Sequence, residues 1–313
     1  MAVAAVIVTF NSAQVIDACL EAVSKMAPET TVVVIDNGSS DGTVQQVRAQ
    51  PGVQLIANRE NRGFAAAVNQ GVREAGDAGF VWLLNPDAYV QTGPDDLVKA
   101  SQQYGLAAGK LVDCVGRAQA GFTVRRLPTP GSLVFELLGI NRLWPSNPVN
   151  RKYRDLDRDL DQPGPVEQPA GAFLMARRDV WEKLGGLDER FHPVWFEDVD
   201  FCRRALDAGY RIEYVPTVIA VHEGAHSMGR IPAGCRAAYW CVNLLKYSEK
   251  HFRSFAFRGI CMAVVLGSVP RMVAGVIAER SFLPFITYLK IMRFAGRCFM
   301  SPVHVGKGVT EIP

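Results

Sequence analysis

The sequence lacks the cysteine pattern of a disulfide-built or zinc-binding module. It has seven cysteines in 313 residues, an odd number, and no Cys-x-x-Cys pair. Disulfide frameworks and zinc knuckles need paired, regularly spaced cysteines, so the pattern argues against both classes of protein. Free cysteines fit a reducing compartment, and we expect the cytosol.

A glycine-rich first turn is missing as well. Residues 3–8 predict a first strand, residues 13–27 carry apolar side chains at helical spacing, and residues 31–35 predict a second strand. The turn between the first strand and the helix reads Thr-Phe-Asn-Ser, whereas a dinucleotide-binding fold needs Gly-x-Gly-x-x-Gly at this point. The start of the chain therefore predicts a parallel α/β sheet with a right-handed crossover, and it argues against a nicotinamide or flavin enzyme.

A basic segment ahead of the first apolar run is also absent. Residues 2–8 are apolar, but Thr9, Asn11 and Ser12 follow almost at once. A secretory signal needs a basic start and a longer apolar core, so we expect a first strand here and no export.

Acidic residues are scarce near the end of the chain. Residues 251–300 contain only Glu279 against seven arginines and lysines, which gives this stretch a charge of +6, while the whole chain has +3. No nucleic-acid partner is expected. A basic, apolar stretch of this kind is instead typical of segments that contact an anionic membrane surface.

The same region predicts three helices, at residues 239–246, 259–278 and 282–300. The middle one approaches the length that spans a bilayer, about 20 residues, but Pro270 and Arg271 interrupt it near its centre, where a charge is costly. We therefore expect residues 233–313 to form a helical tail that lies on a membrane and does not cross it. The alternative is an ordinary helical dimer interface, which leaves a homodimer open.

Residues 80–84 form an uncharged run that leads into Asn85-Pro86-Asp87. A run without alternation predicts a strand buried on both faces, hence a central strand. Because Pro86 cannot continue a sheet, Asp87 is expected at the carboxyl edge, where open α/β sheets bind ligands. The alternative is a turn aspartate that bonds its own backbone.

Two further strands lead into polar residues in the same way. Asp36 ends the second strand and opens a polar turn through residue 43, and a third strand at residues 53–57 leads into Asn58 and a polar run up to Gly63. For Asp36, a helix-capping loop is the alternative. Three strands that end in polar side chains at one edge predict a nucleotide cleft.

Several motifs in this order resemble the inverting family-2 glycosyltransferases with the GT-A fold. The motifs lie at residues 6–11, 36–43, 61–65, 85–87 and 197–200. The resemblance covers about residues 3–230 and is strongest to rhamnosyltransferases that act on polyprenyl-diphosphate-linked sugars, which share Asn85-Pro86-Asp87 and the stretch 225–230. It implies an α/β, Rossmann-like, mostly parallel sheet flanked by helices, in a catalytic domain of residues 1–232 with an irregular insertion at 113–168.

The resemblance also implies roles for individual residues. Asp198 is the general base, and Asp87 with His222 holds Mg2+ or Mn2+ against the donor diphosphate. The expected nucleotide-sugar-binding residues are Thr9, Asn11, Asp36, Asn37, Arg62, Gly63, Asn69 and Asp87. The expected acceptor-binding residues are Gly171, Ala172, Trp195 and Glu197. One departure affects the metal site, because the Asp-x-Asp of the wider family is Asn85-Pro86-Asp87 here and one carboxylate is lost.

The implied activity is transfer of a sugar, L-rhamnose from dTDP-L-rhamnose as the best match, to a lipid-diphosphate-linked saccharide at the cytoplasmic face of the membrane. Two other function classes remain open from the residues alone. A nucleotide-sugar-binding scaffold would not need Asp198, and a glycoside hydrolase would use Asp198 with Asp200 or Glu197 as a carboxylate pair. Acids in the first turn of a helix also serve as capping and dipole partners.

Overall fold

The computed structural model describes residues 2–224 and 232–300. The chain divides into two compact units. The first, here called the sheet unit, comprises Met1–Leu127, Arg154–Glu189 and Glu197–Gly229. The second, the helical unit, comprises Pro128–Tyr153, Arg190–Phe196 and Arg230–Pro313. The stretch 225–230, which carries part of the resemblance, lies outside the described residues.

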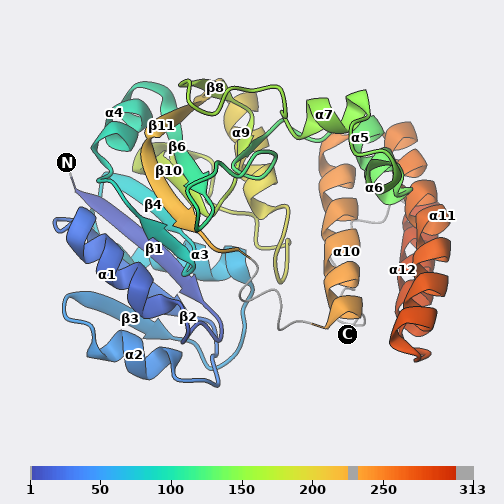
Figure 1. Ribbon diagram of the computed structural model, residues 1–313, viewed down its shortest axis with the longest axis horizontal. Helices are drawn as coiled ribbons and strands as arrows, with labels where there is room; N and C mark the ends of the chain where they lie inside the picture. The colour runs from blue at the N-terminus through green and yellow to red at the C-terminus, as the bar shows by residue number, and fades with distance from the viewer. Residues whose placement is uncertain (1, 225–231, 301–313) are drawn as a thin grey trace. The chain divides into compact units, whose positions relative to one another are not determined.

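The sheet unit is built on a nine-stranded sheet within the described residues (Figure 1). The main path runs β3 Val53–Ala57, β2 Thr31–Asp36, β1 Val3–Thr9, β4 Phe80–Leu84, β10 Phe173–Arg177, β6 Gly105–Val112, β11 Arg211–His222 and β5 Ala88–Val90. β8 Gly164–Val166 pairs with β11, and β7 Val124–Arg125 pairs with β9 Gln168–Pro169 in a separate small sheet. β1, β2, β3 and β4 pair in parallel, while β10 is antiparallel to both of its neighbours. The sheet is thus mostly parallel with some antiparallel pairs, as predicted.

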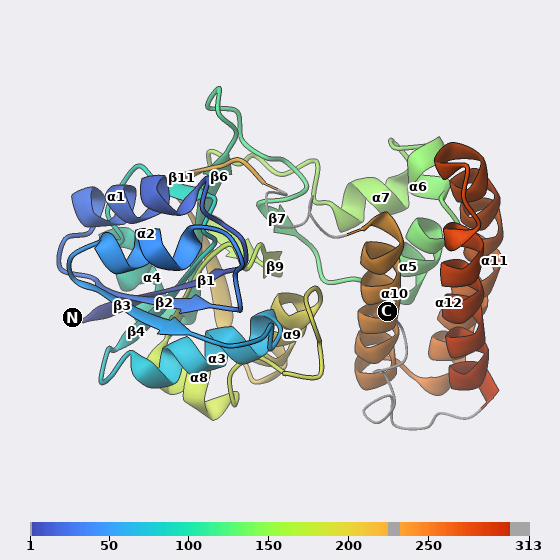
Figure 2. The same ribbon diagram turned by 90° about the horizontal axis from the view of Figure 1, so that it is seen from below.

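Helices cover both faces of this sheet. The helices of the sheet unit are α1 Ile16–Met26, α2 Thr43–Ala49, α3 Phe64–Glu74, α4 Asp95–Tyr104, α8 Arg178–Lys183 and α9 Glu197–Asp207. Figure 2 shows α1 and α2 on one side of the strands and α3 and α8 on the other. Each side has its own buried apolar cluster, one packed on α1, α2 and α4, the other on α3, α8 and α9.

β4 confirms the prediction of a central strand buried on both faces. All five of its residues are buried. Phe80, Trp82 and Leu84 belong to one apolar cluster, whereas Val81 and Leu83 belong to the other. Successive side chains of a strand point to opposite faces, so an uninterrupted apolar run is what a sheet covered on both sides requires.

The sequence did not predict the elements between residues 88 and 112. β5, α4 and β6 all form there, and β6 lies between β10 and β11 in the sheet. β11 is one continuous strand, whose register against β6 shifts between Val215 and Ile219. The shift accommodates the extra residues without ending the strand, as a β-bulge does.

Within the insertion at 113–168, residues 130–143 form two short helices. α5 Pro130–Leu137 and α6 Ile140–Leu143 are separated by Gly139, whose φ of +77° is left-handed. Such a residue ends a helix, and glycine adopts this conformation without strain. Together with α7 Pro148–Tyr153 they belong to the helical unit.

The remaining helices of this unit are α10 Ala233–His251, α11 Ser254–Glu279 and α12 Leu283–Met300. The prediction that Pro270 and Arg271 interrupt the middle helix is wrong, because α11 continues through Pro270. Arg271 lies on the inner side of the unit, where its guanidinium donates to the carbonyls of Leu137, Glu136 (3.0 Å) and Gly267 (2.8 Å). The positive charge of Arg271 is thus stabilised by carbonyl groups that accept its hydrogen bonds, one of them within α11 itself.

Candidate active site

Asp36 is held rigidly at the end of β2. Its carboxylate is buried and accepts hydrogen bonds from the Thr9 hydroxyl (2.9 Å) and from the Ser39 N–H (2.9 Å). Asn11 joins the same loops, because its N–H donates to Ser39 Oγ (2.8 Å) and its Oδ1 accepts from the Ser40 N–H (2.8 Å). The structure therefore brings Thr9, Asn11 and Asp36 together, as the sequence predicted for neighbouring parallel strands.

Asn37 connects this edge to the loop before α3. Its Nδ2 donates to Asn61 Oδ1 (3.0 Å) and to the Gly63 carbonyl (3.2 Å), and its Oδ1 accepts from the Arg62 N–H (3.1 Å). Gly63 has a φ of +84°, a conformation that favours glycine. The Arg62 side chain is exposed next to this loop. These residues make a hydrogen-bonded backbone turn with the exposed Arg62 side chain at its edge, where the guanidinium donates to Gln70 Oε1 (3.4 Å).

Asn69 has both ends of its amide engaged within the protein. Its Nδ2 donates to the Leu187 carbonyl (2.8 Å) and to Glu189 Oε1 (3.0 Å), while its Oδ1 accepts from the Leu187 N–H (2.9 Å). The residue therefore connects α3 to the loop after α8. The nucleotide-binding role expected of Asn69 stays a prediction.

Asp87 and His222 meet because β5 and β11 are antiparallel neighbours. His222 pairs in register with Ala88, the residue after Asp87. His222 Nε2 lies 3.5 Å from Asp87 Oδ1, and both side chains are buried. The two residues singled out as metal ligands, 135 positions apart in the sequence, thus present a nitrogen and an oxygen to each other.

Neighbouring groups fix the His222 ring. Its Nδ1 is 3.2 Å from Gln119 Oε1, the Gln119 amide donates to the His222 carbonyl (2.6 Å), and Phe122 stacks on the ring at 5.0 Å between centroids. Orientation of the distal ring nitrogen by a hydrogen bond is how metal-binding histidines are held. Gln119 and Phe122 come from the irregular insertion, which gives no sequence signal for either residue.

The pair fits a divalent ion held mainly by phosphate oxygens. Two donors that each bind Mg2+ at about 2.0–2.1 Å can lie up to about twice that distance apart, so 3.5 Å is compatible with one shared ion. Nearby Cys19 donates its thiol to the Asn85 carbonyl (3.6 Å), and burial and then the charge of Asp87 raise its pKa to about 12. Among the described residues no group of three or more His, Cys, Asp or Glu side chains forms a metal cluster. Any ion at this site would therefore take its remaining ligands from substrate and water.

Asp198 lies in the first turn of α9 and is half-buried. Its Oδ2 accepts from the Gly171 N–H (3.0 Å) and its Oδ1 from the Val199 N–H (2.8 Å). A Cβ at Gly171 would lie 2.9 Å from the Asp198 Cβ, so only glycine allows this approach. Burial raises the pKa of Asp198, and the two N–H groups and then the charge of Arg125 lower it in part. The result is a positioned carboxylate with enhanced basicity.

Glu197 is the more deeply buried member of the carboxylate pair. Burial, followed by the charge of Asp198, raises its pKa well above the ordinary value. Its Oε2 is buried and has no hydrogen-bond partner within the part of the chain that the structure describes. A buried polar atom without a partner costs stability, so such atoms are often kept for a ligand. Ala172, also expected at the acceptor site, is buried directly after Gly171.

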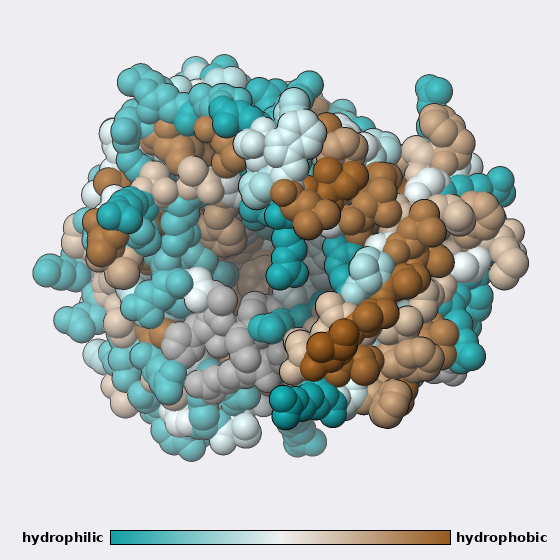
Figure 3. Space-filling view, turned by 45° about the vertical axis from the view of Figure 1, so that its right-hand side comes forward, coloured by the Kyte–Doolittle hydropathy of each residue, from teal (hydrophilic) through white to brown (hydrophobic). Residues whose placement is uncertain are grey.

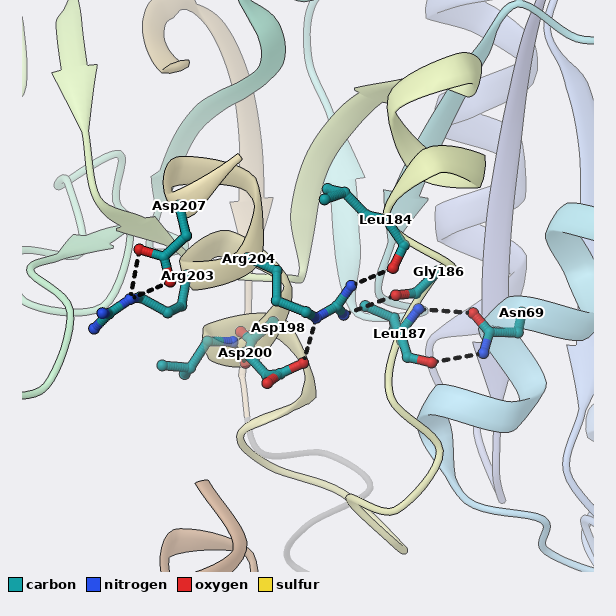
Figure 4. Close-up of polar contacts among 10 residues, drawn as sticks. Asn69, Leu184, Gly186, Leu187, Asp198, Asp200, Arg203, Arg204 and Asp207 are labelled. Atoms are coloured by element: carbon teal, nitrogen blue, oxygen red, sulfur yellow. Dashed lines mark hydrogen bonds and ion pairs between the residues drawn. The ribbon is translucent and has the colours of Figure 1, made fainter. Parts of the chain in front are cut away.

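A polar clamp fixes the start of α9 to the loop after α8. The Arg204 guanidinium donates to the fully buried Asp200 (2.7 Å), to the Leu184 carbonyl (2.6 Å) and to the Gly186 carbonyl (2.8 Å). Figure 4 shows Arg204 reaching this loop from one side while Asn69 holds Leu187 from the other. Asp200, two residues after Asp198, is thus committed to structure, which leaves Asp198 and Glu197 as the candidate reactive pair.

The structure places Trp195 in the helical unit, with a φ of +80°. The preceding backbone is fixed on α10, where the Asn243 amide donates to the carbonyls of His192 (3.2 Å) and Val194 (2.8 Å). Phe196, the next residue, packs against Tyr247 with ring centroids 5.5 Å apart. The acceptor-binding role expected of Trp195 stays a prediction.

Comparison with known proteins identifies the family of the chain. Residues 4–182 match the family described as Glycosyl transferase family 2. Over 240 residues the chain is 35% identical to the N-acetylglucosaminyl-diphospho-decaprenol L-rhamnosyltransferase of Mycobacterium tuberculosis, an alignment that covers 71% of this chain and 75% of that protein. It is 25% identical over 206 residues to the rhamnosyltransferase WbbL of Escherichia coli, covering 62% of this chain and 73% of that protein.

Solved structures show the same fold at low sequence identity. The crystal structure of GalNAc-T7 with UDP, GalNAc and Mn2+ has a TM-score of 0.57 at 16% identity, covering 80% of this chain and 48% of that one. The mannosyltransferase PcManGT from Pyrobaculum calidifontis, with GDP-Man and Mn2+, has a TM-score of 0.52 at 16% identity, covering 96% and 87%. The expected α/β architecture is thereby confirmed.

Proposed function

Because the chain belongs to glycosyl transferase family 2, we propose that it transfers L-rhamnose from dTDP-L-rhamnose to a hydroxyl of a lipid-diphosphate-linked saccharide, with inversion at the anomeric carbon. The rhamnosyl donor and the lipid-linked acceptor are inferred from the relative at 35% identity, whose name states both an L-rhamnosyl transfer and a decaprenyl-diphosphate-linked sugar. The observation that carries the proposed chemistry is the anchored carboxylate of Asp198 beside the buried Glu197.

Asp198 is the general base of the proposed reaction. As the acceptor oxygen attacks the anomeric carbon, its proton passes to the Asp198 carboxylate and the bond to the donor diphosphate breaks. The Gly171 and Val199 N–H groups fix the carboxylate, so the oxygen that takes the proton does not have to reorient. A base whose pKa is raised towards the working pH is the more effective proton acceptor, and such bases contribute about 10²–10⁴-fold to rate.

Asp87 and His222 would hold Mg2+ or Mn2+. The ion, when bound, supplies positive charge that offsets the charge on the leaving diphosphate. The chain's own contribution is a nitrogen and an oxygen 3.5 Å apart, with the ring oriented by Gln119. The loss of the first carboxylate in Asn85-Pro86-Asp87 makes His222 the necessary second protein ligand in this proposal.

The strand ends at β1 and β2 would bind the nucleotide. Buried Asp36 is positioned by Thr9 and by Ser39, so it can accept a hydrogen bond from the pyrimidine base, and Asn11 lies against the same turn. Asn37, Arg62 and Gly63 make up the neighbouring wall.

The acceptor would bind where Gly171 and Ala172 meet the start of α9. Burial, followed by the charge of Asp198, raises the pKa of Glu197 and so favours its protonated form, which can donate a hydrogen bond to an acceptor oxygen. The lipid-linked acceptor places the reaction at the cytoplasmic face of the cell membrane, in synthesis of a cell-wall or surface polysaccharide.

A donor and acceptor panel tests the proposal. Purified protein is incubated with dTDP-L-rhamnose or with UDP- and GDP-sugars, together with an N-acetylglucosaminyl-diphospho-lipid, and the products are weighed by mass spectrometry. We expect a product heavier by one deoxyhexose from dTDP-L-rhamnose alone. Transfer from another donor would refute the rhamnosyl assignment, and binding of every donor without transfer would refute the enzyme in favour of a binding scaffold.

A further inference from the structure

The outer face of α11 is apolar although it is exposed. Met262, Leu266, Val269, Val273 and Ile277 recur every three or four residues and therefore share one side of the helix. They are exposed, Leu266 at 56% and Ile277 at 72%. The buried residues of α11 lie between Phe257 and Ser268 and are largely apolar as well, so only part of this apolar helix is covered by protein.

The apolar face continues onto the start of α12. Phe282, Leu283, Phe285 and Ile286 are exposed, Phe282 at 77%. Only three residues link α11 to α12, so the two helices form an antiparallel hairpin. A Cβ at Gly275 would lie 2.8 Å from the Cβ of Pro284, which shows how closely the helices pack near the connection. The turn therefore presents its apolar side chains from a rigid base.

Together these nine residues form what we call the hairpin surface. Figure 3 shows hydrophobic residues gathered on the face of the helical unit that this view presents. Monomeric soluble proteins rarely expose so continuous an apolar patch without a partner.

Arginines surround the hairpin surface. Arg258, Arg280, Arg293 and Arg297 are exposed on α11, on α12 or in the turn between them, and Glu279 is the one acidic residue within residues 254–300. A second copy of the chain would present the same excess of basic residues, with Glu279 as the one acid of this stretch to pair with them. An anionic lipid headgroup layer, in contrast, complements them directly.

α11 passes the length and composition test for a membrane span, with a mean hydropathy of 2.0, but a third of that window is buried in protein. Arg271 lies on the covered side, bonded to carbonyls of α5. A helix with one side packed on its own unit and one side exposed can lie in a membrane interface more readily than it can cross a bilayer.

We propose that the hairpin surface docks onto an anionic phospholipid bilayer, with its apolar side chains at the acyl boundary and its arginines among the headgroups. The inference deepens the proposed function, which requires a membrane-bound acceptor, but it depends on the helical unit alone. The occupant is the bilayer itself and not a protein or a soluble lipid.

Vesicle sedimentation tests this docking. Full-length protein is mixed with phosphatidylcholine vesicles or with vesicles that contain phosphatidylglycerol, and the bound fraction is measured at low and high salt. We expect binding to the anionic vesicles that high salt reduces. The triple variant Ile277→Asp, Phe282→Asp, Ile286→Asp should bind at least tenfold less, whereas Val115→Asp, which changes a residue of the sheet unit that is 66% exposed, should bind as the wild type does.

Circular dichroism of each variant verifies that the helices remain. If the folded triple variant binds vesicles like the wild type, the proposal is overturned. The proposal is also overturned if the wild type is a dimer in solution, the triple variant is a monomer, and neither binds vesicles. In that case the hairpin surface is a dimer interface. Transfer to a short-chain, detergent-soluble acceptor separates this result from the proposed function, because the triple variant should keep that activity. A wild type that binds vesicles but transfers no rhamnose would contradict only the proposed function.

Discussion

The two units differ in the kind of side chain that each places in an unfavourable environment. The sheet unit buries carboxylates and an imidazole, namely Asp36, Asp87, Glu197, Asp200 and His222. The helical unit exposes large apolar side chains, among them Leu266, Ile277 and Phe282. Buried charge and exposed apolar surface both lower the stability of the folded protein, so each is typical of a surface or site that binds another molecule. The comparison suggests that chemistry belongs to the first unit and membrane contact to the second.

The largest expected effect comes from removing the base in the sheet unit. Asp198→Asn keeps the size of the side chain, but its amide can accept only one of the two backbone N–H bonds and cannot take a proton. We therefore expect kcat to fall at least about a hundredfold while donor affinity is retained. Steady-state kinetics and donor titration measure the two quantities. The variant should still bind vesicles fully. Near-normal turnover would move the base to another residue.

Removal of the metal should weaken donor binding next. EDTA and His222→Ala should each lower affinity for dTDP by about 10–100-fold, since both remove charge opposite the diphosphate, and they should not add to each other. Isothermal titration of dTDP measures this. A matched control is His251→Ala, whose ring contacts Tyr247 in the helical unit. Additive losses would show that His222 acts without a metal.

Breaking the clamp on α9 should act on both stability and turnover. Arg204→Gln leaves the fully buried Asp200 without its cation. Breaking a fully buried ion pair typically lowers the free energy of unfolding by about 3–5 kcal/mol. We expect a smaller loss here because Arg204 is partly exposed. Thermal unfolding should therefore occur at lower temperature. kcat should fall more than KM rises, because Asp198 is displaced. Arg203→Gln removes the cation of the exposed pair with Asp207 and is the control; equal effects of the two variants would refute a positioning role for the clamp.

The smallest effect is a shift in the pH profile. The base works only when ionised, so activity falls as the pH drops through the pKa of Asp198, which burial has raised. Arg125 lowers that pKa in part, and Arg125→Gln should move the acid limb of kcat to higher pH. Arg126→Gln, which removes the cation paired with Asp155 and Glu167, should leave the limb in place. An unchanged profile in Arg125→Gln would show that Asp198 does not control the limb.

Sequence alone predicted the parts of the site that depend on strand ends. Asp36 and Asp87 each follow an apolar strand, and the carboxyl ends of parallel strands meet at one edge, so their placement follows from local pattern and topology. The pairing of Asp87 with His222 depends on β5, which has only three residues and was not predicted. The resemblance to family-2 glycosyltransferases predicted that Asp87 and His222 act together, whereas the periodicity of apolar residues did not.

Other features depend on contacts that no local pattern encodes. Gln119, Phe122 and Arg125 come from an insertion without helical or strand periodicity, so nothing distinguishes them from their neighbours in the sequence. The engagement of Asn69 with Leu187 joins residues 118 positions apart. Pro270 was expected to break a helix, but intrinsic propensity gave way to packing and to the bonds of Arg271.

The anomeric configuration of the product tests the central claim most directly. Nuclear magnetic resonance of the saccharide made from dTDP-L-rhamnose reports whether the new glycosidic bond is inverted relative to the donor. A single displacement with Asp198 as base predicts full inversion in the wild type and no product of either configuration from Asp198→Asn on the same timescale. A retained configuration would contradict this mechanism. A single displacement, in which Asp198 is held by Gly171 and Val199 as the base and not as a nucleophile, cannot retain the configuration.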